Sequence, residues 1–127
     1  MRGGIRCAWQ LLTRKDYAMG NRATIEVKDE TDSAPCYAYV HWNGAPEQVI
    51  EVVVKAAPVM RARDCQYAMA RLIGTCHLEI DTKGGLSLGV TDYKEEFDNG
   101  HYIVDMPKGK ITNEGKVIAE GLEFGQF

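Results

Sequence analysis

No segment of this 127-residue chain is apolar for long enough to cross a membrane, because its longest aliphatic run is residues 52–54 and a span needs roughly 20. A strong excess of one charge is also lacking. The 15 lysines and arginines against 18 acids give a net charge of −3, too weak a field to gather nucleic acid or anionic lipid. What is present is a globular composition, 45% apolar and 26% charged, which excludes wholesale disorder.

Closely spaced metal ligands and phosphate-binding glycines are missing as well. The cysteines form no C-x-x-C pair, the histidines no H-x-x-x-H pair, and the glycines no nucleotide fingerprint. No apolar signal segment is found in residues 1–17. We therefore expect no metal, no cofactor and a cytoplasmic protein, in which the thiols stay reduced and behave as small apolar residues. The cysteines are Cys7, Cys36, Cys65 and Cys76.

Residues 1–18 differ from the rest of the chain. They carry four basic residues and one acid, whereas residues 19–127 are acidic overall. A strand-like pattern begins only after Met19. We interpret residues 1–18 as a leader, mobile or from a non-native start, and residues 19–127 as a single domain. The alternative is a short docking helix, because Ile5, Trp9 and Leu12 fall at helical spacing.

The strands are predicted from alternation of apolar and polar residues. Residues 23–28 alternate with Ile25 and Val27 on one face, and residues 36–42 are aromatic and β-branched on both faces, as in a central strand. Further strands are expected over residues 86–90, 101–106, and 111 with 116–119. Residues 75–80 are compatible with a strand or with the extension of a helix.

Two helices are predicted between these strands. Over residues 48–57, apolar residues follow an amphipathic stripe, preceded by Pro46 in the first turn. A second helix is expected over residues 65–74, with Asp64 as N-cap and Gly74 as its C-terminal stop. Arg61, Arg63 and Arg71 are interpreted as its solvated rim. The predicted fold is α+β, with the order β-β-α-α-β-β-β and an antiparallel sheet of four or five strands that carries both helices on one face.

Three segments of this chain resemble a known group of proteins. Residues 19–23 read Met-Gly-Asn-Arg-Ala, residues 39–47 contain Val-His-Trp-Asn-Gly-Ala-Pro-Glu, and residues 98–104 read Asp-Asn-Gly-His-Tyr-Ile-Val. The chain is similar to small uncharacterised proteins of bacteriophages, plasmids and integron-type gene cassettes. The resemblance covers residues 19 to about 106 and implies a mobile-element accessory protein, without implying any catalytic residue.

Candidate site residues gather where the predicted second strand runs into the loop before a helix, a common place for binding sites. His41 would be a polar anchor or general base, and Asn43 would orient a ligand. The alternative is a core Trp42, a half-buried His41 and a simple turn at Asn43. No catalytic residue is assigned. The candidate ligand- or partner-binding residues are Tyr39, His41, Trp42, Asn43, Asn99 and His101.

Three functions are compatible with these features. The first is a non-enzymatic module that binds a host or element-encoded protein, using residues 41–47 and the acidic, aromatic segment 92–127. The second is a small enzyme that uses a cysteine together with His41. The third is a structural protein that self-associates as a homodimer by pairing residues 122–127 as an edge strand. We expect no nucleic-acid and no membrane partner.

Overall fold

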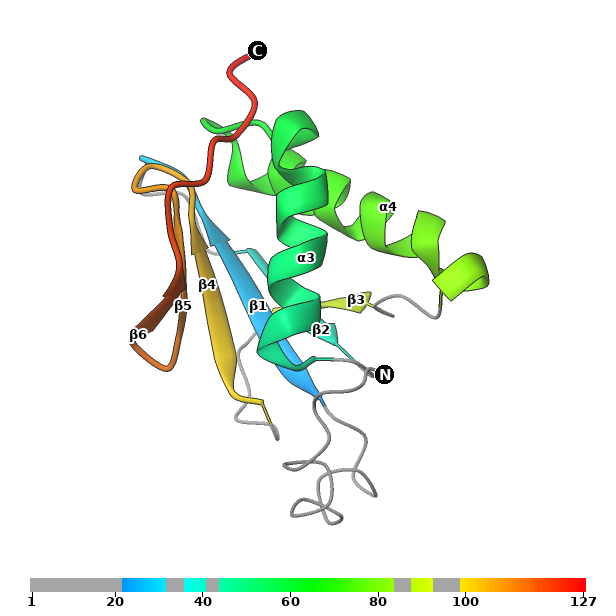
Figure 1. Cartoon of the computed structure of the whole chain (residues 1–127). Coiled ribbons are helices and arrows are strands. Elements are labelled where there is room, and N and C mark those ends of the chain that lie inside the picture. The colour runs from blue at the N-terminus through cyan, green and yellow to red at the C-terminus, as the bar shows by residue number, and fades with distance from the viewer. Residues whose placement is uncertain (1–21, 32–35, 41–43, 84–87, 93–98) are drawn as a thin grey trace.

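The computed structural model describes residues 22–31, 36–40, 44–83, 88–92 and 99–127, with only the backbone given for 79–83 (Figure 1). The predicted α+β class is confirmed. The residues named in the sequence prediction that lie outside this part of the chain include the proposed leader and residues 41–43. The elements are β1 (Ala23–Lys28), β2 (Cys36–Val40), α3 (Pro46–Ala56), the 3₁₀ turn η1 (Ala57–Val59), α4 (Cys65–Lys83), β3 (Leu88–Thr91), β4 (His101–Asp105), β5 (Lys110–Asn113) and β6 (Lys116–Ala119).

The sheet is mixed, not antiparallel, and has six strands in the order β3-β2-β1-β4-β5-β6. The central pair, β1 and β4, is parallel, with Thr24 opposite His101. The other neighbouring pairs are antiparallel. The predicted antiparallel sheet of four or five strands is therefore wrong in these details. A parallel pair needs a long connection, and here β2, both helices and β3 separate β1 from β4 along the chain.

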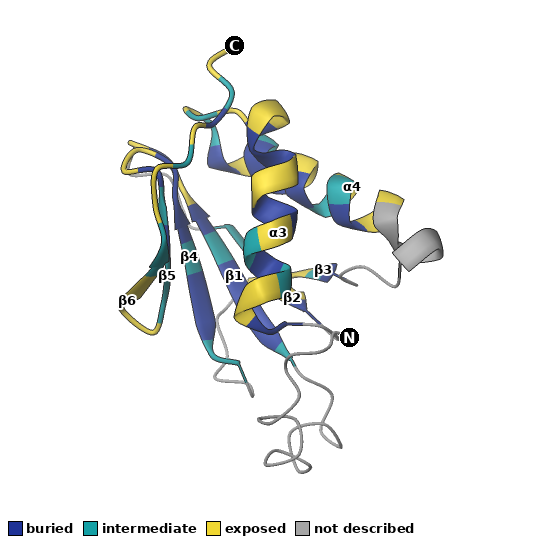
Figure 2. Cartoon of the chain, viewed as in Figure 1, coloured by how far each residue is buried: buried dark blue, intermediate teal, exposed yellow. Residues whose placement is uncertain are grey.

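The core lies between the sheet and the two helices, which cover the same face (Figure 1). The alternation predicted for β1 is confirmed, since Ile25 and Val27 are fully buried. Tyr102 and Val104 of β4 are buried beside them. Figure 2 shows the buried residues of α3 and α4 turned toward the sheet and the exposed ones turned away.

Helix α3 follows the predicted stripe, with four buried residues on its sheet side. Pro46 occupies the first turn, where a missing N–H breaks no hydrogen bond. The chain then tightens into η1, where Pro58 lies, before α4 begins. The buried residues of α3 are Val49, Val52, Val53 and Ala56.

Helix α4 begins as predicted but is longer than predicted. The Asp64 Oδ1 accepts a 3.1 Å hydrogen bond from the Tyr67 N–H, which is the expected N-cap. Gly74 does not end the helix, which continues to Lys83, so residues 75–80 are helical. The reason is packing: Leu72 and Cys76, on either side of Gly74, are both fully buried and hold the helix against the sheet layer. None of the described helices is long and apolar enough to span a bilayer.

Gly74→Ala is expected to raise the free energy of unfolding by about 0.5–1 kcal/mol, because glycine in a helix interior costs more backbone entropy than alanine. An added Cβ at Gly74 would meet no atom within 4 Å. Urea unfolding gives the value. The matched control is Gly115→Ala, which also has open space but a φ of +86° and should destabilise the protein. Equal effects of the two substitutions would contradict this explanation.

The C-terminal segment lies against its own chain near η1. The Gly125 N–H donates to the Ala57 carbonyl at 3.0 Å, and the Gly125 carbonyl accepts from the Ala62 N–H at 2.8 Å. A Cβ on Gly125 would come within 2.6 Å of the Pro58 carbonyl oxygen, so glycine allows this close approach. Phe124 is buried. The segment 122–127, which the self-association alternative uses as an edge strand between copies, thus has backbone hydrogen bonds to η1 and to the residues before α4.

Candidate functional site

Tyr39, Asn99 and His101 are the predicted site residues that the structure describes, and His41, Trp42 and Asn43 lie outside it. Tyr39 and His101 fall on the face of the sheet that points away from α3 and α4, which we call the outer face. The register explains this placement, since Thr24 of β1 lies opposite both Tyr39 and His101. Sequence reasoning selected these two residues separately, and the structure brings their strands to either side of β1.

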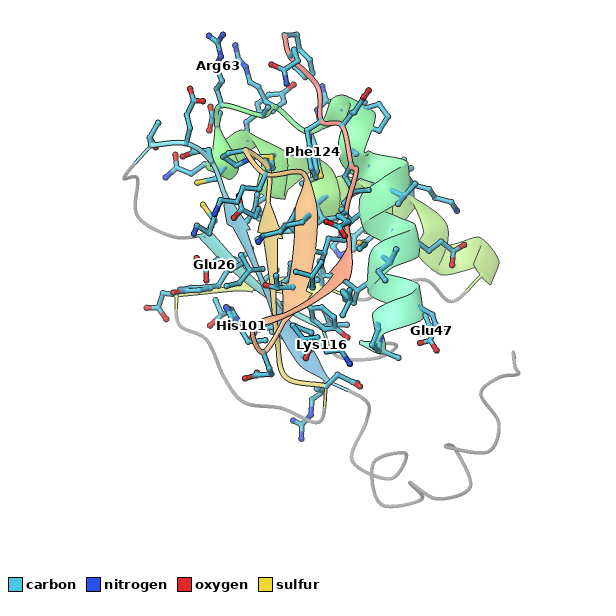
Figure 3. All side chains as sticks on the ribbon, turned by 60° about the vertical axis from the view of Figure 1, so that its left-hand side comes forward. Glu26, Glu47, Arg63, His101, Lys116 and Phe124 are labelled. Atoms are coloured by element: carbon cyan, nitrogen blue, oxygen red, sulfur yellow. The ribbon has the colours of Figure 1, made fainter. Side chains whose placement is uncertain are left out.

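His101 is the centre of a hydrogen-bonded cluster on the outer face. Its Nδ1 lies 2.7 Å from the Thr24 Oγ1, and its Nε2 lies 3.0 Å from the Glu26 Oε1. The His101 backbone N–H donates to the Glu114 Oε2 at 2.8 Å. Figure 3 shows Glu26 and His101 close together beside β1 and β4. The parallel register of these strands creates the cluster, which we call the His101 network (Thr24, Glu26, His101 and Glu114).

The His101 network has the hydroxyl–imidazole–carboxylate order of a catalytic triad but not its accessibility. A nucleophilic hydroxyl must reach a substrate, and Thr24 is 0% exposed. His101 is 7% exposed, and both of its ring nitrogens already have partners. The role that this arrangement supports is structural: it gives buried polar groups their hydrogen-bond partners and joins β1 to β4.

Two tyrosines extend the outer face from the His101 network. The Tyr37 ring centroid lies 5.8 Å from that of His101. Burial, followed by the negative charge of Glu26, raises the pKa of Tyr37. Tyr39 is 41% exposed and lies across Gly89 of β3, where an added Cβ would be 2.5 Å from its ring. Among the predicted site residues that the structure describes, Tyr39 is the large side chain that is exposed to solvent.

Asn99 has a structural part in the turn before β4. Its N–H donates to the Arg22 carbonyl at 2.9 Å, and its carbonyl accepts from the Asn113 side-chain amide at 2.8 Å. Gly100 has a φ of +76°, the left-handed conformation that glycine adopts without strain. This turn sets the point at which β4 enters the sheet beside β1.

A thiol pair lies on the helix side of the sheet. The sulfur atoms of Cys36 and Cys65 are 3.6 Å apart. Burial, followed by the hydrogen bond to Cys36, raises the pKa of Cys65 to about 12, so its thiol stays protonated near neutral pH. Cys36 and Cys65 therefore face the core, whereas His101 lies across the sheet on the outer face. The spacing of cysteines in the sequence gave no signal for this pair.

Asp29 joins the end of β1 to the start of α4. Its Oδ1 accepts from the N–H and hydroxyl of Thr31 at 2.8 and 2.6 Å, and its Oδ2 accepts from the Cys65 N–H at 2.8 Å. Desolvation alone would raise the pKa of Asp29, but these hydrogen bonds to its charged form outweigh it and hold the pKa below the usual 3.8.

Asp29→Asn is expected to lower the free energy of unfolding by about 1–2 kcal/mol at pH 7, because a neutral amide binds the helix start more weakly. A carboxyl whose pKa is depressed in the folded state stabilises the fold above its unfolded pKa and loses this effect as the pH falls through the folded pKa. The difference between the proteins should therefore shrink below about pH 4. Urea unfolding at pH 7 and pH 3 tests this, with the exposed Glu30→Gln as control. A difference that does not change with pH would refute the role of the Asp29 charge.

No group of three or more His, Cys, Asp or Glu side chains suited to a metal ion occurs among the residues that the structure describes. His77, on α4, has its Nε2 3.1 Å from the Leu88 carbonyl oxygen, which links the helix to β3. No known family, curated protein or solved structure matches this chain.

Proposed function

We propose that this chain is a mobile-element accessory protein that binds another protein and performs no chemistry itself. The mobile-element origin rests on the resemblance of residues 19–23, 39–47 and 98–104 to proteins of phages, plasmids and gene cassettes. The binding function rests on the distribution of polar groups between the interior and the surface. The partner is a protein encoded by the host or by the element.

The observation that carries this proposal is that the polar groups at the centre of the His101 network already have hydrogen-bond partners within the chain. Both imidazole nitrogens are bonded within the chain, and the hydroxyl of Thr24 is fully buried. Exposed side chains with recognition chemistry include the aromatic Tyr39 and the cationic Arg61. Aromatic and arginine side chains are enriched at protein interfaces, where they supply most of the binding energy.

The test is purification of the tagged full-length chain from its own host, followed by reconstitution with the recovered protein. We expect one protein at a fixed stoichiometry and a dissociation constant in the micromolar range or below for the purified pair. Recovery of no protein above an untagged control would contradict the proposal. The enzyme alternative predicts that Cys-to-Ser changes at positions 36, 65 and 76 abolish the phenotype, whereas the binding function predicts that they leave partner affinity within twofold.

A second candidate function, self-association, is favoured by the position of β6 at the end of the sheet. Its backbone has a neighbour on one side, β5, and Val117 is exposed. Lys116 within the strand and Glu120 just after it place charges at both ends of this edge, which opposes pairing between copies. Sedimentation velocity across a hundredfold concentration range separates the two functions, since self-association through β6 requires a dimer that Val117→Lys dissolves.

A further inference from the structure

An arginine and aromatic cluster lies where the start of α4 meets the C-terminal segment. The Arg61 guanidinium carbon is 5.4 Å from the Tyr67 ring centroid and 5.8 Å from that of Phe127. The Arg71 guanidinium carbon is 5.2 Å from the Tyr67 centroid. The Tyr67 and Phe127 rings meet edge to face at 5.9 Å. We call these four residues, together with the exposed Arg63 two positions from Arg61, the arginine surface.

Hydrogen bonds fix the two stacked guanidinium groups and leave much of each group unused. The Nε and Nη2 of Arg71 donate to the Tyr67 hydroxyl at 3.1 and 2.7 Å. The Nε of Arg61 donates to the Phe127 carbonyl at 3.0 Å. Within the described residues, no bond is made by either terminal amino group of Arg61 or by the Nη1 of Arg71. These donors belong to side chains that are exposed to solvent.

Aspartate and glutamate side chains do not pair with the arginine surface in the parts of the chain that the structure describes. None of their carboxylates lies within 4 Å of the charged nitrogens of Arg61, Arg63 or Arg71, and the Arg61 Nε instead binds the main-chain oxygen of Phe127, the last residue of the sequence. Asp64 and Asp29, near the start of α4, direct carboxylate oxygens to the backbone N–H groups of Tyr67 and Cys65. Figure 3 places Arg63 at the end of the molecule far from Lys116. Two guanidinium groups on one tyrosine ring, with an exposed arginine close to them in the sequence, therefore stand on a chain whose net charge is −3.

We propose that the arginine surface binds an acidic segment of the partner protein, whose Asp and Glu carboxylates accept hydrogen bonds from Arg61 and Arg71. This inference rests on the proposed protein-binding function and names its surface. Guanidinium groups suit carboxylates because two parallel N–H donors match the two oxygens. A protein segment is favoured over nucleic acid because the whole chain carries a net charge of −3, which repels a long polyanion beyond the three arginines.

The test uses a fluorescein-labelled peptide of ten glutamates and the full-length protein, followed by fluorescence anisotropy at 50 mM NaCl. We expect saturable binding that Arg61→Gln with Arg71→Gln weakens by about tenfold or more, and that 150 mM NaCl also weakens. Lys116→Gln removes one positive charge far from the cluster and should change affinity by less than about twofold. Arg63→Gln, at an exposed side chain that forms no hydrogen bond with the described residues, should weaken binding by about threefold without affecting folding.

Several results would overturn the inference. They are no binding of the peptide, equal binding by the double variant, or tighter binding of a ten-nucleotide single-stranded DNA than of the peptide. Thermal unfolding of each variant excludes loss of fold as the cause, and Arg63→Gln decides the matter if the double variant is unstable. Failure here, with a partner still recovered from the host, removes only the arginine surface. Failure to recover any partner removes the binding function itself.

Discussion

Leu72→Ala is expected to lower the free energy of unfolding by about 3 kcal/mol, and the melting temperature by about 10 °C. Leu72 is 0% exposed and packs in the core formed by α4, α3 and the sheet. Removing its isobutyl group loses the transfer free energy of the buried carbons and leaves a cavity that the surrounding side chains fill incompletely. Urea unfolding, fitted with a common slope, measures the effect.

Leu78→Ala provides the matched control. Leu78 lies on the same helix but is 82% exposed, so the same substitution should change the free energy of unfolding by less than about 0.5 kcal/mol. The contrast tests which side of α4 faces the sheet. Similar losses at both positions, or a larger loss at Leu78, would show that the helix is rotated or unpacked.

Oxidised glutathione is expected to join Cys36 and Cys65 in a disulfide that raises the free energy of unfolding by about 3.5 kcal/mol. Two thiols lose two protons and two electrons, and one oxidised glutathione is reduced to two glutathione thiols. The sulfurs are already 3.6 Å apart and must approach to about 2.05 Å. The two cysteines are 29 positions apart, and closing a loop of that size restricts the unfolded chain by roughly this free energy.

The order of the two exchange steps follows from exposure and protonation. Cys36 is half-buried and reacts first with glutathione, and the second step is slow because burial raises the pKa of the Cys65 thiol that must attack the mixed disulfide. Mass spectrometry of non-reduced peptides identifies the bond. Cys36→Ala should abolish the bond and the gain in stability, and Cys76→Ala should retain the bond. A persistent mixed disulfide at Cys36, or a bond to another cysteine, would contradict the geometry.

The sequence pattern predicted which residues face the core better than it predicted how the strands pair. Alternation identified the buried face of β1, because side chains on a strand alternate whatever its neighbour is. The same alternation is compatible with parallel and antiparallel partners. The pairing of Thr24 with His101 therefore had no signal in the residues, since it depends on where the chain returns after both helices and β3.

The length of α4 could not be read from local preference. Glycine commonly ends helices, and it costs about 1 kcal/mol relative to alanine in a helix interior. This preference suggested that α4 ends at Gly74. The free energy gained by burying Leu72 before Gly74 and Cys76 after it exceeds that cost. Cys76 was the available signal, because it continues the stripe of Ala68 and Leu72 at intervals of four residues.

The candidate site was predictable in part. Tyr39 was selected from the sequence, and it lies exposed on the outer face because it alternates along β2 with the buried Ala38 and Val40. Thr24 and Glu26 were expected only as the polar side of a strand, and nothing in the sequence linked them to His101. Arg61, Arg63 and Arg71 were interpreted as a solvated rim. The spacing of Tyr67 and Arg71, four residues apart on a helix, was a usable signal for their contact.

Hydrogen exchange of the full-length chain, alone and with its recovered partner, tests the central claim that binding occurs away from the His101 network. The account predicts slower exchange in peptides that cover residues 61–71 and 122–127 when the partner is bound. It predicts no change in the exchange rates of residues 101–105, which form β4 and include His101. Protection confined to residues 24–28 and 101–105, with none near Arg61, would place the binding site on the outer face and contradict the account.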